Sequence, residues 1–189
     1  MIPSSDSSRP RVLLVSGTVG AGKSTVLDEI HTQLCAAEVA HACVDVDALR
    51  LSWPPRGRFN ETAAAENLGS VWRNFRAAGA SRLVVAAVVE RREDVAALQQ
   101  TLDSGRPTIC QLQASETTRL ARIRAREPGS ALAWHLARTT ELQAILDGAA
   151  LADFAVSNDG RAVQQVAAEV LRRAGWLPAS QRRERRGGV

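Results

Sequence analysis

The sequence contains no tyrosine, one methionine and only one lysine, Lys23, although arginine is abundant. It also lacks any apolar run near the ~20 residues that a helix needs to cross a membrane. Residues 1–10 are polar and rich in serine and proline, without the apolar core of a signal peptide. These absences argue against a membrane-spanning or exported protein and predict a cytoplasmic one.

Cysteine and histidine are scarce as well. The three cysteines are odd in number, widely spaced and without a C-x-x-C pair, and the three histidines show no metal-ligand spacing; they are Cys35, Cys43, Cys110, His31, His41 and His135. The pattern predicts reduced core cysteines rather than a disulfide framework or a metal centre.

The length of 189 residues and a hydrophobic content of 45% are typical of one domain with a sizeable core. We predict a disordered tail over residues 1–10, a domain over 11–177 and a basic disordered tail over 178–189. The net charge of +4 is concentrated in that last segment, which is rich in arginine. A solvated tail explains it, and a nucleic-acid partner is disfavoured because few aromatic residues are available to stack on bases.

Residues 17–24 read GTVGAGKS and fit G-x-x-x-x-G-K-[ST], the P-loop pattern. Glycines let the backbone bring its N–H groups close to a polyphosphate, the lysine reaches the β- and γ-phosphates, and the serine hydroxyl faces Mg²⁺. The predicted nucleotide-binding residues of this stretch are Gly17, Thr18, Val19, Gly20, Ala21, Gly22, Lys23, Ser24 and Thr25. Lysine also suits the position because it is a compact, flexible point charge, unlike arginine.

Apolar strand-like runs alternate with helix-like periodicity along the chain. Strands are predicted over 11–16, 40–47, 83–89, 107–112 and 153–157, and helices over 24–37, 61–78, 91–102, 115–126, 131–146 and 161–174. Asn60 and Ser115 are the expected N-caps of two of these helices. Such alternation predicts an α/β fold with a parallel sheet, in which ligands bind at the carboxyl ends of the strands.

Three acids lie near predicted strand ends. Asp45 and Asp47 are two residues apart and would share one face of a strand. Asp47 is the better candidate to orient an acceptor hydroxyl or take its proton, although it could hold a Mg²⁺-bound water or cap a turn. Glu90 is a candidate metal ligand, or simply the start of a helix.

Basic residues follow in two places. Arg119, Arg122 and Arg126 recur at helical spacing and could close over a nucleotide to neutralise the transferring phosphoryl group, or form a solvated basic face. Arg50 and Trp53 follow the aspartate pair and could line an acceptor pocket as an anion clamp and an apolar wall, or belong to an exposed loop.

Together these motifs resemble the P-loop small-molecule kinases of the nucleotide-kinase-like superfamily. That group includes shikimate, gluconate and adenylylsulfate kinases, chloramphenicol phosphotransferase and the zeta toxins, and the chain most resembles its uncharacterised actinobacterial-type ATP-binding proteins. The resemblance rests on GTVGAGKST, VDVD, RLARIRARE and ADFAVSNDGRAVQQVAAEVL.

The resemblance implies a three-layer P-loop NTPase fold with a five-stranded sheet in the order 2-3-1-4-5 and a small helical lid at about residues 115–130. It further implies ATP and Mg²⁺ as cofactors, Asp47 as the acceptor-side acid, and Arg119 and Arg122 as lid arginines. The turn from Asn158 to Arg161 would then lie near the adenine.

The leading hypothesis is a phosphotransferase that moves the γ-phosphoryl group of ATP to a small hydroxyl-bearing acceptor. A P-loop NTPase that acts as a regulatory module is the alternative, although neither LSGGQ nor N-K-x-D occurs in the sequence. A nucleic-acid end kinase or binder is the third. The sequence specifies neither the acceptor nor the oligomeric state.

Overall fold

The computed structural model describes residues 9–57, 59–126, 129 and 131–177. The strands in this part of the chain are β1 (Arg11–Ser16), β2 (His41–Asp45), β3 (Arg82–Ala86), β4 (Thr108–Gln113) and β5 (Phe154–Ser157). The helices are α1 (Lys23–Ala36), α2 (Val46–Leu49), α3 (Glu61–Ala77), α4 (Arg92–Leu102), α5 (Glu116–Arg126), α6 (Ala131–Ala149) and α7 (Val163–Arg173). Residues 1–8 of the tail predicted over 1–10, and the whole basic tail predicted over 178–189, lie outside the described residues.

All five strands are parallel and form one sheet in the order β2-β3-β1-β4-β5, which confirms the predicted topology. The central strand β1 pairs with β3 on one side and β4 on the other, so that Leu13 aligns with Val84 and with Thr108. This places the segment that follows β1 in the middle of the sheet's carboxyl edge.

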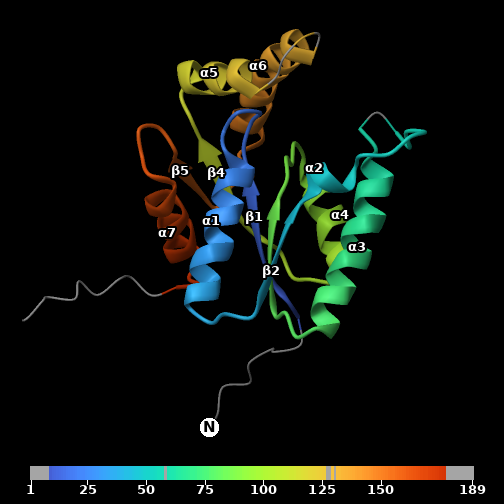
Figure 1. The fold of residues 1–189 in the computed structure, drawn as a ribbon. Coiled ribbons are helices and arrows are strands. Elements are labelled where there is room, and N and C mark those ends of the chain that lie inside the picture. The colour runs from blue at the N-terminus through green and yellow to red at the C-terminus, as the bar shows by residue number, and fades with distance from the viewer. Residues whose placement is uncertain (1–8, 58, 127–128, 130, 178–189) are drawn as a thin grey trace, which may run out of the picture.

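Helices cover both faces of the sheet (Figure 1). Leu13 and Val15 of β1 belong to a core shared with α1 and α7, whereas Val12 and Leu14 belong to a second core shared with α3 and α4. Because successive residues of a strand point to opposite faces, a continuous apolar run is required when both faces are buried. The sequence RVLLVS meets that requirement.

The last layer is a pair of helices, α5 and α6, which lie across the carboxyl ends of the strands (Figure 1). They pack against each other, and α6 runs to Ala149, three residues beyond its predicted end. The predicted N-cap of α5 is confirmed, since Ser115 Oγ accepts a hydrogen bond from Thr118 N at 3.2 Å. We refer to α5 and α6 together as the lid helices.

Two predicted strand ends were wrong. β2 ends at Asp45 instead of Asp47, because Asp45 Oδ1 accepts a hydrogen bond from Asp47 N at 3.0 Å and starts the short helix α2. Asp45 and Asp47 therefore do not share a strand face. β3 ends at Ala86, so Glu90 follows a segment of irregular backbone rather than a strand.

Asn60 precedes α3 as predicted, but its side chain does not cap that helix. Its backbone adopts the left-handed conformation with φ of 55°, and its side chain turns to the preceding loop instead. There Nδ2 donates to the carbonyls of Arg50 at 2.8 Å and Ser52 at 3.1 Å, and Oδ1 accepts from Arg56 N. Asn60 thus holds the loop over residues 50–56, which we call the acceptor loop.

None of the helices among the described residues combines the length and the apolar character needed to cross a bilayer.

Candidate phosphate site and adjoining cleft

The loop between β1 and α1 contains two positions whose backbone conformation favours glycine. Gly20 and Gly22 have φ of 80° and 94°, in the left-handed region that favours glycine. A Cβ on Gly22 would lie 2.5 Å from Asn158 Nδ2, and one on Gly20 would lie 2.8 Å from the carbonyl oxygen of Arg119. The loop is therefore wedged between the β5–α7 turn and the lid helices.

The N-terminus of α1 is prepared for an anion. It carries neither a capping side-chain hydrogen bond nor an acidic residue in its first turn. A helix N-terminus exposes backbone N–H groups and a partial positive charge, so an uncapped one favours phosphate. Lys23 begins this helix.

Lys23 points into the loop, where Nζ donates to the carbonyl oxygens of Gly17 at 3.0 Å and Thr18 at 3.2 Å. Burial lowers the pKa of its ammonium group, while the carboxylates of Asp47 and Asp45 act in the opposite direction. The loop thus holds its single lysine close to the uncapped helix start.

Asp45 lies beside the P-loop serine. Ser24 Oγ donates to Asp45 Oδ2 at 2.6 Å, and Asp45 Oδ1 is the cap of α2. A hydroxyl next to a carboxylate is a set of hard oxygen donors of the kind that Mg²⁺ prefers. The residues present therefore fit a magnesium ion at Ser24 and Asp45.

Glu90, the second predicted metal ligand, is held elsewhere. Its carboxylate forms an ion pair with Arg138 of α6, which also pairs with Glu141 at 2.8 Å. The prediction chose Glu90 as the acid at the end of the third strand, whereas the contact to Ser24 is made by Asp45, the last residue of β2. Glu90 lines the cleft that opens beside Lys23 and Ser24, on the side of α6.

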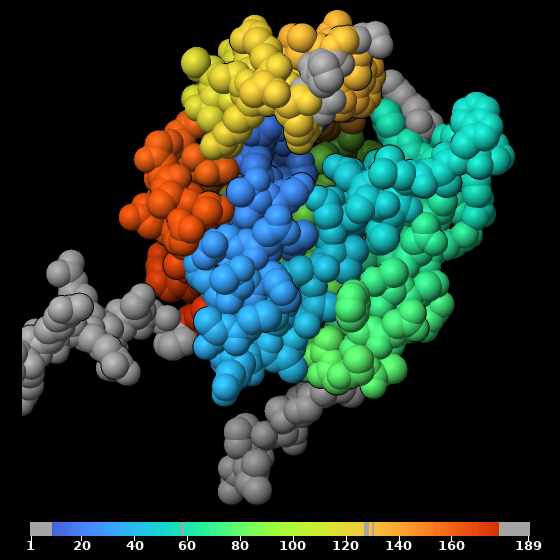
Figure 2. All heavy atoms as spheres, viewed as in Figure 1, coloured from blue at the N-terminus to red at the C-terminus, as the bar shows by residue number. Residues whose placement is uncertain are grey.

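A cleft of about 1180 Å³ opens next to Lys23 and Ser24. It lies between the lid helices and the segment from α2 to α3, where Figure 2 shows the surface hollowed. Ligand pockets are commonly ~300–1,000 Å³, so this cleft has room for a nucleotide and a second small molecule.

The lid arginines separate into two kinds. Arg122 and Arg126 line the cleft, and Arg122 Nη1 lies 3.3 Å from the carbonyl oxygen of Gly20. Arg119 does not line it, being only 7% exposed. Arg119 Nη1 instead donates to the carbonyl of Ala114 at 2.6 Å and to Gln143 Oε1 at 2.9 Å, which ties α5 to α6. The predicted placement of Arg119 over the nucleotide is therefore corrected.

The lining of the cleft also contains Asp47 and Arg50, whose side chains pair at 3.3 Å. Trp53, predicted as an apolar wall, does not line the cleft and is 88% exposed. Two aromatic side chains do line it, Phe59 and Trp134 of α6, whose ring centroids are 6.3 Å apart.

Sequence reasoning missed this aromatic pair and Arg138, whose guanidinium lies 5.7 Å from the centre of the Phe59 ring. Trp134 and Arg138 are four residues apart on α6 and therefore share one face of it. That spacing is visible in the sequence, but nothing in the neighbouring sequence indicates that this face of α6 contacts Phe59.

Two buried side chains fix the P-loop from outside. Thr139 Oγ1 of α6 donates to the carbonyl of Val19 at 2.8 Å, and Asn158 Nδ2 donates to that of Ala21 at 2.7 Å. Arg161, predicted to lie near the adenine, does not line the cleft. Its guanidinium donates to the carbonyl of Ser157 at 3.0 Å and pairs with Glu169 at 2.8 Å.

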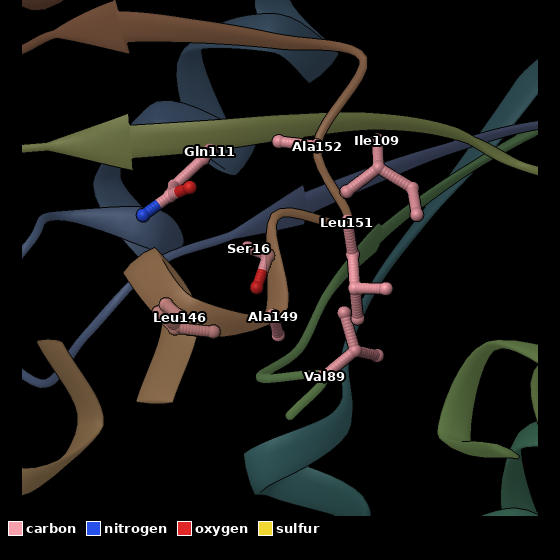
Figure 3. Close-up of a pocket in the computed structure, with 8 residues that line it drawn as sticks. All are labelled: Ser16, Val89, Ile109, Gln111, Leu146, Ala149, Leu151 and Ala152. Carbon is pink, nitrogen blue, oxygen red and sulfur yellow. The ribbon is translucent and has the colours of Figure 1, made fainter. Parts of the chain in front are cut away.

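A second, much smaller cavity lies beside β1, between the sheet and the end of α6 (Figure 3). Its volume is about 10 Å³, and its polar lining consists of Ser16 and Gln111. That is room for about one water molecule, so it is not a ligand site. The large cleft remains the candidate functional site.

Comparison with protein families identifies residues 13–143, more than half of the chain, as an AAA domain. The chain belongs to this family. No curated protein matches the sequence.

Solved structures share the fold at low identity. The tunicamycin resistance protein of Deinococcus radiodurans matches with a TM-score of 0.63 and 18% identity over 89% of this chain and 98% of its own. A gluconokinase from Sinorhizobium meliloti 1021 matches with a TM-score of 0.61 and 19% identity, over 88% and 92%. The Mycobacterium tuberculosis APS kinase in complex with AMPPNP and APS matches with a TM-score of 0.54 and 18% identity, over 86% and 96%. The fold is that of the P-loop nucleotide kinases.

Proposed function

We propose that this protein is an ATP-dependent phosphotransferase that moves the γ-phosphoryl group of ATP to a hydroxyl group of a small molecule. The observation that carries the proposal is the position of the P-loop lysine and the uncapped start of α1 beside a cleft large enough for two ligands. A module that only hydrolyses a nucleotide needs no second compartment.

The nucleotide side of the proposal uses the P-loop. Its backbone N–H groups and Lys23 bind the phosphates, and Arg122 lies where charge builds up on the transferring group. Lys23 exchanges its present partners, the carbonyls of Gly17 and Thr18, for phosphate oxygens. Arg119 is proposed as a positioning residue, because it joins α5 to α6 and contacts the P-loop only through its backbone.

Mg²⁺ would be held by Ser24 and by the carboxylate of Asp45, directly or through water. When bound, the ion neutralises phosphate charge and orients the chain of phosphates. Glu90 remains a proposed metal ligand, but its ion pair with Arg138 favours a role in holding α6 beside the cleft.

The acceptor side uses Asp47 and Arg50, which line the cleft on its far side from α5. The acceptor oxygen forms a bond to the γ-phosphorus while the bond from that phosphorus to the bridging oxygen breaks and ADP leaves. The acceptor hydroxyl proton passes to the Asp47 carboxylate. Phe59 and Trp134 give the acceptor an apolar wall, which favours an acceptor with an apolar or aromatic face.

The decisive experiment measures ADP formation from Mg-ATP with and without a panel of hydroxyl compounds: sugars, nucleosides, adenylylsulfate, and aminoglycoside- or chloramphenicol-like antibiotics. Asp47→Asn is assayed beside the wild type, and ATP affinity is measured for both. We expect one class of acceptor to stimulate ADP release, and the stimulation to vanish in Asp47→Asn while ATP binding is retained.

Slow ADP release that no acceptor stimulates would instead favour the NTPase alternative. Stimulation that survives in Asp47→Asn would remove Asp47 from its proposed role and leave the phosphotransferase proposal standing.

A further inference from the structure

Three of the six histidines and cysteines that looked scattered in the sequence meet in one place, away from the P-loop. His31 and Cys35 are four residues apart on α1, and His41 begins the neighbouring strand β2. One ligand atom from each lies within 4.8 Å of the others. Neither the proposed phosphotransfer nor the sequence analysis gives these three side chains a role, and the prediction that Cys35 is a core residue was wrong, since it is exposed.

Their hydrogen bonds show which atoms are available. His41 Nδ1 lies 2.6 Å from the carbonyl of Val39, which can only accept, so Nδ1 carries the proton and Nε2 carries a lone pair. His31 Nδ1 lies 2.9 Å from that lone pair. A backbone carbonyl that fixes the tautomer and orientation of an imidazole is the usual support of a metal-binding histidine.

Cys35 completes a triangle. Its Sγ lies 3.7 Å from both ring nitrogens of His31, so the thiol is close to a ring nitrogen of His31 whichever tautomer that ring adopts. In a tetrahedral zinc site with bonds of ~2.0–2.3 Å, ligand atoms are spaced by roughly 3.3–3.8 Å. Two sides of the observed triangle, 2.9 and 3.7 Å, are near that spacing, and the third is within 4.8 Å.

We propose that His31, Cys35 and His41 form a binding site for Zn²⁺ or a similarly thiophilic divalent transition metal. Imidazole and thiolate ligands select such ions over Mg²⁺, which prefers oxygen. Three protein ligands leave a fourth position for water or a further ligand. On binding, the Cys35 thiol releases its proton to solvent as the metal–sulfur bond forms.

The site is separate from the nucleotide site. His31 and Cys35 lie eight and twelve residues after Lys23, which is about 12 and 18 Å along the axis of α1. Figure 1 shows this end of α1 leading into β2, at the opposite edge of the sheet from the lid helices. A bound metal would clamp the end of α1 to the start of β2 and stabilise the fold without touching the cleft.

Cys43 is the natural control. It lies two residues after His41 on the same face of β2, where it is half-buried and packs against the core. It does not belong to the group of three side chains whose ligand atoms lie together. Thr32 is a second control, because it is an exposed non-ligand on the same turns of α1.

The test uses the full chain without a histidine tag, reduced and stripped of metal by EDTA. Zn²⁺ affinity is measured by competition with a chromophoric chelator, and Co²⁺ is used as a spectroscopic probe. We expect one Zn²⁺ per chain and a thiolate-to-Co²⁺ charge-transfer band. Cys35→Ser should abolish that band and weaken Zn²⁺ binding at least about 100-fold, more than loss of an outer-shell partner does. His41→Gln should weaken binding to a similar extent.

Cys43→Ser and Thr32→Ala should keep both the band and the affinity. Circular dichroism of each metal-free variant confirms that it is folded, and a rise in Tm with Zn²⁺ is expected in the wild type but not in Cys35→Ser. Absence of Zn²⁺ binding, a Co²⁺ complex without the thiolate band, or wild-type affinity in Cys35→Ser would each overturn the proposal and leave the cluster as a hydrogen-bonded contact only.

Discussion

The two walls of the cleft are built in different ways. On the nucleotide wall, the loop carbonyls are held by buried or half-buried side chains from three separate elements: Lys23, Thr139 and Asn158. On the acceptor wall, the loop over residues 50–56 is held mainly by one side chain, that of Asn60. Leu51 and Trp53 on that loop are largely exposed to solvent.

The difference matches what each wall would bind under the proposed function. A polyphosphate presents the same geometry in every nucleotide, so a rigid, preorganised loop is favourable. An acceptor is bound by a pocket whose shape differs between related enzymes, and loops are the segments that tolerate such variation. The comparison can be tested by disturbing each wall separately.

The largest effect is expected at Lys23. Lys23→Ala removes the cation beside the phosphates, and loss of one such electrostatic contact typically costs 10²–10³-fold in rate. We expect kcat/KM for ATP to fall at least about 100-fold. Because this is the only lysine, amine acylation followed by mass spectrometry reports its accessibility directly, and Mg-ATP should protect it.

Lys23→Arg is the matched control, since it keeps the charge but replaces a point charge by a planar fork. It should remain strongly impaired. Unchanged turnover in Lys23→Ala would show that this wall does not bind the phosphates.

The next prediction separates the two lid arginines. Arg122→Met should lower kcat about 100-fold with little loss of stability, because Arg122 lines the cleft. Arg119→Met should mainly lower the stability instead. It removes the hydrogen bonds to Ala114 and Gln143 and should lower the free energy of unfolding by about 1–3 kcal/mol, with a smaller effect on kcat.

Urea unfolding and steady-state kinetics of both variants test the assignment. Arg119→Met could instead lose kcat as strongly as Arg122→Met while keeping its full stability. In that case the prediction from sequence for Arg119 is right, and the role of joining α5 to α6 is wrong.

The fold and the nucleotide wall could be predicted because their signals are local. Residues 17–24 carry their own backbone requirements, and the apolar run of β1 shows that both faces of its sheet are buried. The alternation of strands and helices then leaves few topologies. The strand order followed from the family resemblance.

The acceptor wall could not be predicted because its contacts join segments far apart in the sequence. Trp134 lies 75 positions after Phe59 by their residue numbers, and Arg138 of α6 pairs with Glu90 in the segment between β3 and α4. The periodicity placed Arg119 correctly on a helix but could not tell which side of that helix α6 would cover. The same limit applies to His31, Cys35 and His41, because only the packing of α1 against β2 brings them together.

A smaller effect is expected where the acceptor wall is pinned. Asn60→Gly keeps the left-handed backbone but removes the side-chain hydrogen bonds to the acceptor loop. We expect a loss of about 1–3 kcal/mol in the free energy of unfolding. KM for the acceptor should rise while ATP affinity stays unchanged. A matching loss of ATP affinity would show that the two walls are coupled rather than independent.

The smallest effect is expected at Asp159, which joins the β5–α7 turn to the start of α5. Hydrogen bonds from Thr118 and from Ser115 N, the latter at 2.6 Å, hold the pKa of its carboxyl below the ordinary value. A depressed pKa means that the carboxylate stabilises the fold above the unfolded-state pKa of ~3.9, and that this contribution is lost as the pH falls through the folded pKa.

Asp159→Asn should therefore be less stable than the wild type at pH 7, and the difference in stability should disappear on acidification. Urea midpoints of both proteins between pH 7 and pH 3 measure it, with exposed Asp28→Asn as the control. A gap that stays constant with pH would mean that the turn is held by its backbone alone, and that the carboxylate does not help to anchor the lid helices on the nucleotide wall.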